Sequence, residues 1–306
     1  MEYETREPEA QPLEPADKGE NCMSTKFIKV ISLATLVWFG TIEAGAHEAG
    51  APFSGAFPEP ILLHHAHIED EQRINMTGFE NFRTQRGEES ALSAEMELAF
   101  TWSEDFRFGS EIFIPFSNTG ISNDKYGFGD LEIQPIKYAF FNEPETVLTG
   151  ALSVALPTGD ESRGLGGEQT ALGGKLLWDQ AYRNWYLGVN IEYEAAVSGP
   201  TSSEFEIATA ITYSFIDETG EGIAPAMPHQ FLVPTVMLEL LSESVLTGTE
   251  KGQDIITLAP GLQIWHPASN WKFRVGVGFP LTSDRENDFA VYFQFGNHFD
   301  WGHFLE

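Results

Sequence analysis

The stretch DFAVYFQFGNHFDW, residues 288–301, lies near the end of the chain and places an apolar side chain at every second position. The series runs from Phe289 to Phe295, and Phe299 and Trp301 continue it after an interruption at Asn297. Alternation with a period of two predicts a β-strand with one apolar face. Whether that face meets a protein core or lipid decides the fold class.

The same alternation recurs in most of the chain, and it predicts twelve strands of about 10–13 residues each. Such strands are long for a globular protein, where about 5–6 residues is usual. They match the roughly 9–11 residues that a tilted strand needs to cross a bilayer. A change of phase near Pro135 predicts a β-bulge. The predicted strands are residues 73–83, 91–102, 106–116, 130–141, 146–157, 170–179, 185–196, 204–215, 230–241, 254–265, 271–280 and 288–299.

The connections between these strands alternate in length. Links such as 142–145 and 266–270 are short, whereas 117–129 and 158–169 are long and rich in Gly, Ser and Asp. Short periplasmic turns and longer external loops are typical of outer-membrane barrels. The long link at 216–229 falls in a periplasmic position and is the exception.

The two faces of the predicted strands favour lipid on the apolar side. The best apolar faces carry no charge and often end in Trp, Tyr or Phe, while the opposite faces combine Gly, Ala, Ser and Thr with Glu. We therefore predict an all-β fold, an antiparallel transmembrane β-barrel of about twelve strands over residues 73–299. The alternative is a soluble, secreted β-sandwich that binds ligands.

The N-terminal region carries a targeting signal. Lys26 and Lys29 follow Met23, an apolar run occupies residues 30–42, and an Ala-Gly-Ala site ends at Ala46. The apolar run is too short to span a bilayer, which needs about 20 residues. The pattern therefore predicts a signal peptide at 23–46 and hence export to the bacterial outer membrane. Residues 1–22 are expected to be an untranslated or disordered extension, 47–72 a periplasmic segment and 300–306 a C-terminal tail.

Composition excludes several functions. A formal net charge of −29 argues against nucleic-acid binding, because phosphate contacts need Lys and Arg. The single cysteine, Cys22, excludes a disulfide within the chain. No G-x-S-x-G motif is present, and the histidines do not pair with a nucleophile on adjacent predicted strands. We predict neither an enzyme nor a cofactor.

The predicted inward faces combine acids with bases and suggest a narrow polar channel for small molecules. Acids in or beside the external loops, among them Glu204 and Glu243, predict a preference for cations or neutral solutes. The alternative is a non-conducting structural barrel plugged by cross-strand salt bridges. The pore-lining candidates are Arg73, Glu95, Glu97, Arg107, Glu111, Glu132, Lys137, Lys175, Glu192, Glu194, Glu206, Glu239, Lys272 and Arg274.

A histidine-rich stretch, HHAHIED at residues 64–70, precedes the first predicted strand. His64, His65 and His67 beside carboxylates are able to bind Zn, Cu or Ni. The other interpretation is a polar periplasmic segment without a metal. Short His-rich tracts have low specificity, so we favour this second interpretation and predict no metal site.

Two resemblances extend these expectations. Gln294-x-Gly296-x-x-Phe299-x-Trp301 resembles the C-terminal assembly signal of bacterial outer-membrane barrels, which implies the barrel assembly machinery, membrane lipid and lipopolysaccharide as partners. GFGDLEIQPIKYAF at 127–140 and ALSVALPTGD at 151–160 resemble a bacterial outer-membrane family described as the meta-pathway of phenol degradation, or "transporter", family. This second resemblance, over about residues 126–299, implies a barrel that carries small aromatic or hydrophobic molecules. The polar inward faces show no apolar passage for such cargo.

Overall fold

The computed structural model describes residues 58–84, 87–118, 126–163, 165–167, 169–199, 202–216, 231–267, 269–284 and 287–298. The predicted extension, signal peptide and C-terminal tail lie outside these residues, as do Phe299 and Trp301 of the assembly signal. No helix within these ranges is long and apolar enough to cross a membrane.

Strands make up almost all of the described chain, apart from one short 3-10 helix, η1, at Glu161–Arg163. The strands are β1 Glu71–Thr84, β2 Gly87–Thr101, β3 Phe108–Asn118, β4 Tyr126–Phe128, β5 Leu131–Glu143, β6 Thr146–Leu156, β7 Ala171–Tyr182, β8 Trp185–Ala196, β9 Ser203–Ser214, β10 Val233–Thr247, β11 Asp254–His266, β12 Trp271–Pro280 and β13 Phe289–His298.

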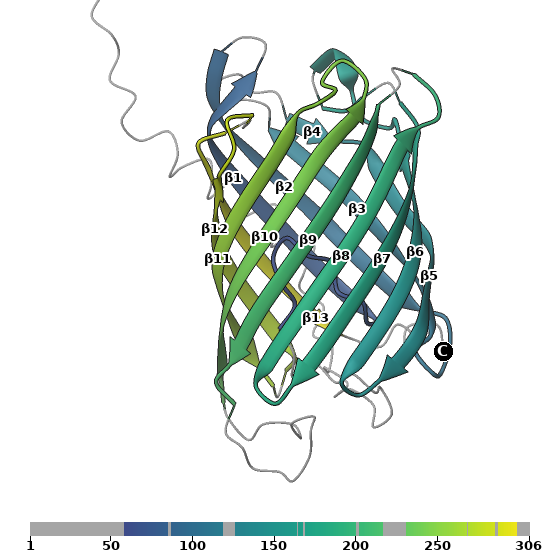
Figure 1. The fold of residues 1–306 in the computed structure, drawn as a ribbon, viewed down its shortest axis with the longest axis vertical. Coiled ribbons are helices and arrows are strands. Elements are labelled where there is room, and N and C mark those ends of the chain that lie inside the picture. The colour runs from purple at the N-terminus through teal and green to yellow at the C-terminus, as the bar shows by residue number, and fades with distance from the viewer. Residues whose placement is uncertain are drawn as a thin grey trace, which may run out of the picture. The chain divides into compact units, whose positions relative to one another are not determined.

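The strands form one closed antiparallel barrel (Figure 1). Apart from β4, each strand pairs with the strands before and after it in the chain, so that β3 pairs with β5, and β1 closes the ring by pairing with both β2 and β13. The short β4 pairs with β3 alone, at the edge of the ring. Without β4, the described residues form a barrel of twelve strands, which confirms the predicted fold class and shows that the sandwich alternative is wrong.

Most strands begin and end close to the residues predicted from the sequence, and β8 and β12 coincide with their predicted ranges. The pairing of β5 with β6 shifts between Ile133 and Ile136, so the predicted bulge at Pro135 is confirmed. The largest difference is β10, which continues to Thr247 instead of ending at residue 241. Its polar last residues still pair with β9 and β11, so their backbone groups stay satisfied beyond the apolar part of the strand.

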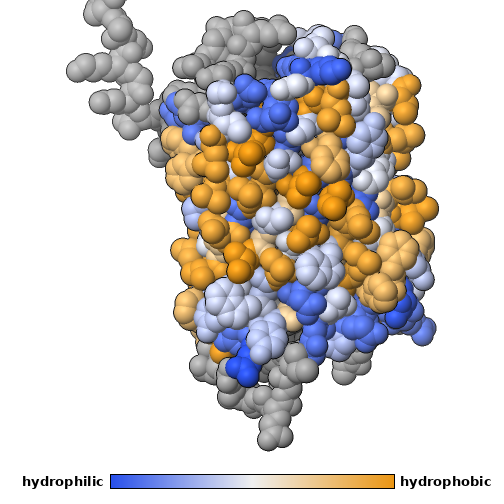
Figure 2. All heavy atoms as spheres, viewed as in Figure 1, coloured by the Kyte–Doolittle hydropathy of each residue, from blue (hydrophilic) through white to orange (hydrophobic). Residues whose placement is uncertain are grey.

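The outer surface of the barrel is apolar. Side chains such as Trp185, Leu187, Ile191 and Tyr193 on β8 are exposed, whereas the side chains between them face inward. Figure 2 shows apolar residues over the middle of one face and hydrophilic residues gathered towards its two ends. A water-soluble sheet buries its apolar face, so this inverted arrangement is that of a barrel surrounded by lipid.

The two ends of the barrel differ in their connections. At the end that we call the short-turn end, β5 and β6, β7 and β8, and β11 and β12 are joined by residues 144–145, 183–184 and 267–270. Arg183 and Asn270 take positive φ angles of 53° and 55°, which tight turns require. The opposite, long-loop end carries links such as 157–170 and 281–288. The predicted alternation of turns and loops is therefore observed, except that only residues 85–86 join β1 to β2.

Candidate functional site: the barrel lumen

Residues 58–70, which we call the lumen segment, run inside the barrel before the chain enters β1 (Figure 1). Glu239 on β10 accepts the backbone N–H groups of Ile61 and Leu62 at 2.7 Å and of Leu63 at 3.1 Å. These residues were predicted to lie in the periplasm, and the structure places them in the lumen instead. A segment without regular structure needs partners for its N–H groups, and the inward carboxylates of the wall supply them.

The lumen segment also contacts the wall on the side formed by β7 and β8. Asp179 on β7 accepts the backbone N–H of Ala66 at 2.7 Å. Asn190 on β8 donates its amide to the carbonyl oxygen of His64 at 2.8 Å. The segment is therefore held by polar contacts with several strands around the ring.

An ionic cluster fixes the beginning of the lumen segment. The carboxylate of Glu59 contacts the guanidinium groups of Arg73 on β1 and Arg274 on β12, and the ammonium group of Lys272 on β12. All four side chains are buried, with at most 4% exposure. Arg73 also pairs with Glu97 on β2. Buried charges persist only when they are paired, so the wall cations and the segment carboxylate depend on each other.

Small residues of the wall make room for apolar side chains of the segment. A Cβ atom at Gly109 on β3 would lie 2.6 Å from Ile68 Cγ2, and one at Gly276 on β12 would lie 2.6 Å from Ile61 Cδ1. Real Cβ contacts are never this short, so these positions suit glycine. At these positions the absence of a side chain on the inward face of the wall leaves space for side chains of the lumen segment.

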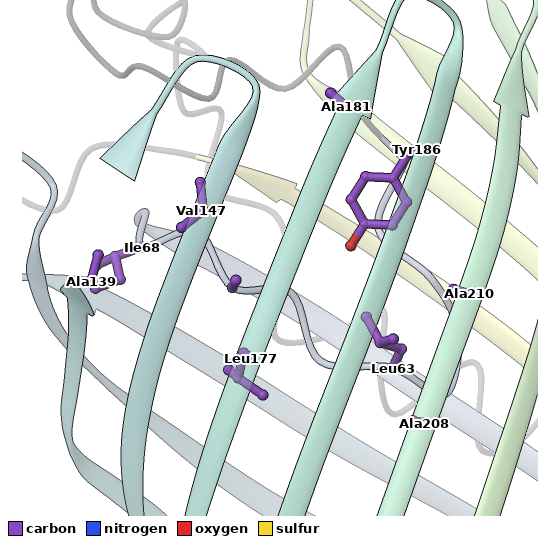
Figure 3. Packing of buried hydrophobic residues seen from close by; sticks show 10 residues of the cluster. Leu63, Ile68, Ala139, Val147, Leu177, Ala181, Tyr186, Ala208 and Ala210 are labelled. Carbon is purple, nitrogen blue, oxygen red and sulfur yellow. The ribbon is translucent and has the colours of Figure 1, made fainter. Parts of the chain in front are cut away.

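An apolar cluster lies on the side of the lumen formed by β5–β9. Leu63 and Ile68 of the lumen segment pack among inward residues of β5–β9, including Val147, Leu177 and Tyr186 (Figure 3). The remaining members are Ala66, Ala139, Ala181, Ala208 and Ala210. Burial of these apolar side chains stabilises the lumen segment inside the barrel, in addition to its polar contacts.

The predicted pore-lining residues lie on the inward face, with one exception. Arg107 precedes β3 in the turn at the short-turn end, where it pairs with Asp105 at 3.5 Å. The other predicted cations all have carboxylate partners, as the salt-bridge alternative required. Lys137 pairs with Glu111, and Lys175 lies 3.1 Å from both Glu132 and Glu192.

Acids outnumber bases between the lumen segment and the long-loop end. A cavity of about 300 Å³, which we call the acidic cavity, is lined there chiefly by carboxylates. Glu206 on β9 lies directly opposite Glu192 on β8 and Glu243 on β10 in the strand register, and Glu194 lies opposite Glu204. Glu204 lies in β9, as the predicted strand 204–215 required, whereas Glu243 was predicted to follow the end of its strand and instead belongs to β10. The charged residues lining the cavity are Glu132, Lys175, Glu192, Glu194, Glu204, Glu206, Glu243 and Glu250.

A second cavity of about 220 Å³ lies between the segment and β1, β2 and β13. Glu95, Glu97 and Arg73 contribute to its lining. Apart from Glu239, which accepts hydrogen bonds from the lumen segment itself, the predicted acids of the wall that do not pair with a base therefore line one or other of these two cavities, beside the lumen segment.

Two of the three candidate histidines come together. The rings of His65 and His67 are stacked, with their centroids 4.1 Å apart. His67 Nε2 contacts the carboxylate of Glu69, and His65 Nε2 lies 3.9 Å from Glu71 Oε2. The ring of His64 instead lies edge-on to that of Phe113, and His64 lines the acidic cavity.

The histidines differ in their tendency to carry a proton. Burial lowers the pKa of His64 and of His65, and the charges of Lys175 and His67, respectively, lower it further. Burial also acts to lower the pKa of His67, but the carboxylates of Glu69 and Asp179 outweigh it and raise the pKa to about 9.

Sequence reasoning missed several residues of the lumen. Asp179 continues the inward series of Lys175 and Leu177 on β7, so its spacing contained the necessary signal. Glu59 and Glu71 had no comparable signal, because Glu59 belongs to a segment without periodicity and Glu71 precedes the predicted first strand.

Comparison with known proteins agrees with the fold. An outer membrane channel from Pseudomonas putida F1 superposes with a TM-score of 0.54 at 11% identity, covering 79% of this chain and all of that chain. The NanC porin gives a TM-score of 0.47 at 10% identity, over 76% of this chain and 99% of its own. The KdgM porin gives 0.46 at 12% identity, over 75% of this chain and 99% of its own. No family model matches the sequence, and no curated protein matches it.

Proposed function

We propose that this protein is an outer-membrane channel for small solutes and that the lumen segment closes it in the conformation described here. The observation that carries the proposal is that the wall does not fill its own lumen. Glycines and alanines line the wall where the segment passes, and a separate stretch of polypeptide occupies the space. Displacement of that stretch would leave a passage at least as wide as an extended chain.

The charge of the lumen suggests the class of solute. The acidic cavity carries several carboxylates and one lysine, so it would concentrate cations and repel anions. We therefore favour cationic or neutral polar solutes. The aromatic or hydrophobic cargo implied by the resemblance to the phenol-degradation family remains a further candidate, and the polar lining does not favour it.

The apolar belt supports an outer-membrane location. In such a membrane the belt would contact lipid, and the acidic loops at the long-loop end would face the lipopolysaccharide layer. The barrel assembly machinery is the partner that we expect to insert the chain. The structure from Pseudomonas putida F1 is a channel by its name, and the absence of catalytic activity in this chain stays a prediction.

Conductance measurements test the channel proposal. We would compare the wild-type barrel in planar bilayers with a variant that lacks residues 58–70, after confirming by heat-modifiable gel migration that both are folded. We expect rare or small openings for the wild type and a large, sustained conductance for the deletion variant. A folded deletion variant that does not conduct would contradict the proposal.

A non-conducting structural barrel is the second candidate, and the buried ionic cluster around Glu59 favours it. Breaking a buried ion pair is strongly destabilising, so a cluster of this kind would hold a permanent filling in place. The wild-type recording separates the two candidates. A structural barrel would show no openings at any voltage or solute concentration, even where its deletion variant leaks.

A further inference from the structure

The histidine cluster has the composition of a metal site. His65, His67 and Glu69 each offer one ligand atom, and these atoms lie within 4.8 Å of one another. A second group with the same spacing consists of Glu59, His65 and Glu71, so His65 belongs to both. All five side chains are buried. An ion with bonds of about 2.0–2.2 Å holds its ligand atoms closer together than this limit, so small shifts of the side chains would bring these nitrogen and oxygen atoms onto one ion.

An independent feature of His65 points to a ligand. Its side chain is only 2% exposed, yet neither ring nitrogen has a hydrogen-bond partner among the residues that the structure describes. Buried polar atoms are nearly always satisfied, and leaving one unsatisfied costs about 1–3 kcal/mol. The ring lies against the other members of the cluster, stacked on His67 and facing Glu71. A metal ion at this point would satisfy one of the two ring nitrogens.

The wall of the barrel orients His67. Its Nδ1 lies 3.5 Å from Asp179 Oδ2, while its Nε2 is directed at Glu69. Asp179 is itself fixed, because it accepts the N–H of Ala66 and the hydroxyl of Tyr186, both at 2.7 Å. A carboxylate behind the far nitrogen of an imidazole is the usual support of a metal-bound histidine.

We propose that His65, His67 and Glu69 bind a divalent transition-metal ion, with Zn²⁺ as the best match and Glu71 in reach as a fourth ligand. Two imidazoles and a carboxylate suit Zn²⁺, whereas Mg²⁺ and Ca²⁺ prefer oxygen ligands alone. The ion would join the lumen segment to the start of β1, and so stabilise the segment inside the barrel. This inference does not depend on conduction through the lumen.

Metal titration of the full chain, prepared without a histidine tag and stripped with a chelator, tests the proposal. Calorimetry with Zn²⁺ should show one site per barrel. His65→Ala and His67→Ala should each weaken binding by about 100-fold or more, since loss of a mere supporting residue already costs about 10–100-fold. His64→Ala is the matched control, and it should bind Zn²⁺ like the wild type.

A spectroscopic arm keeps the test decisive if a variant fails to fold. Co²⁺ bound by the wild type should give the strong visible bands of a four-coordinate ion with nitrogen ligands. Weak bands of a six-coordinate ion that disappear in Glu206→Gln would place binding in the acidic cavity and overturn the proposal. Absence of Zn²⁺ binding, unchanged binding by folded His65→Ala, or equal loss in His64→Ala would overturn it as well.

Discussion

Replacing Glu59 by Gln should release the lumen segment. The substitution keeps the size of the side chain and removes the charge that Arg73, Lys272 and Arg274 share. Three buried cations would then face one neutral amide. Only displacement of the segment, with entry of water and anions, would solvate these cations again, so the change shifts the equilibrium towards an open lumen.

The magnitude follows from the burial of the cluster. Removing one partner of a buried ion pair typically costs about 3–5 kcal/mol. We expect the lower end, about 3 kcal/mol, because Arg73 keeps Glu97 and Arg274 keeps hydrogen bonds to Gln263 and Gln294. At about 1.4 kcal/mol for each factor of ten, the equilibrium constant for opening should rise by roughly 100-fold.

Single-channel recording in planar bilayers measures this change as the ratio of open to closed time. The matched control is Glu104→Gln, which removes an acid from the exposed turn at the short-turn end. It should leave the ratio unchanged. Protection of residues 58–70 from added protease gives a second measure of release.

The reasoning would fail under a clear combination of results. If the variant lacking residues 58–70 conducts while Glu59→Gln opens no more often than the wild type, the ionic cluster does not hold the segment. An equal rise in Glu104→Gln would instead show that total charge, and not this cluster, sets the open time.

Three further predictions follow from the wall and the cavities. Val275→Arg places a charge on the lipid face at a cost of about 2–4 kcal/mol and should reduce the inserted fraction seen on unboiled gels. Gly276→Ala should insert normally and increase channel opening, because its methyl group would clash with the lumen segment. Reversal potentials in a salt gradient should show a cation preference that falls in the Glu192→Gln, Glu206→Gln double variant; an anion preference in the wild type would contradict this. Micromolar Zn²⁺ should lengthen the closed times of the wild type and leave those of His65→Ala unchanged.

The strands were predictable because lipid and lumen impose opposite demands on alternate residues. A stretch such as Trp271–Pro280 on β12 is two-sided over its whole length, so period and boundaries appear together. The limits were harder to predict where pairing continues beyond the apolar zone. Residues 242–247 of β10 look like a loop by composition, yet they remain in the sheet.

The lumen was predictable only in part. Side chains alternate between the two faces of a strand, so a charge at an odd spacing from an outward aromatic residue must face inward. Lys175 and Glu192 are examples. The lumen segment itself has no period, so nothing in its composition distinguishes a peptide inside a barrel from one in the periplasm. Its location depends on partners far along the chain, such as Glu239 for Ile61, 178 residues away.

The ionic cluster also has a consequence for the order of assembly. Glu59 precedes every strand, but Lys272 and Arg274 lie 213 and 215 residues later, on the last strand but one. Contacts of such high sequence separation form late, because the intervening chain must first be ordered. The lumen segment is therefore secured only once β12 is in place, at nearly the same stage as β1 and β13 close the ring. Until then the sheet is open, and the lumen segment has no closed barrel to occupy.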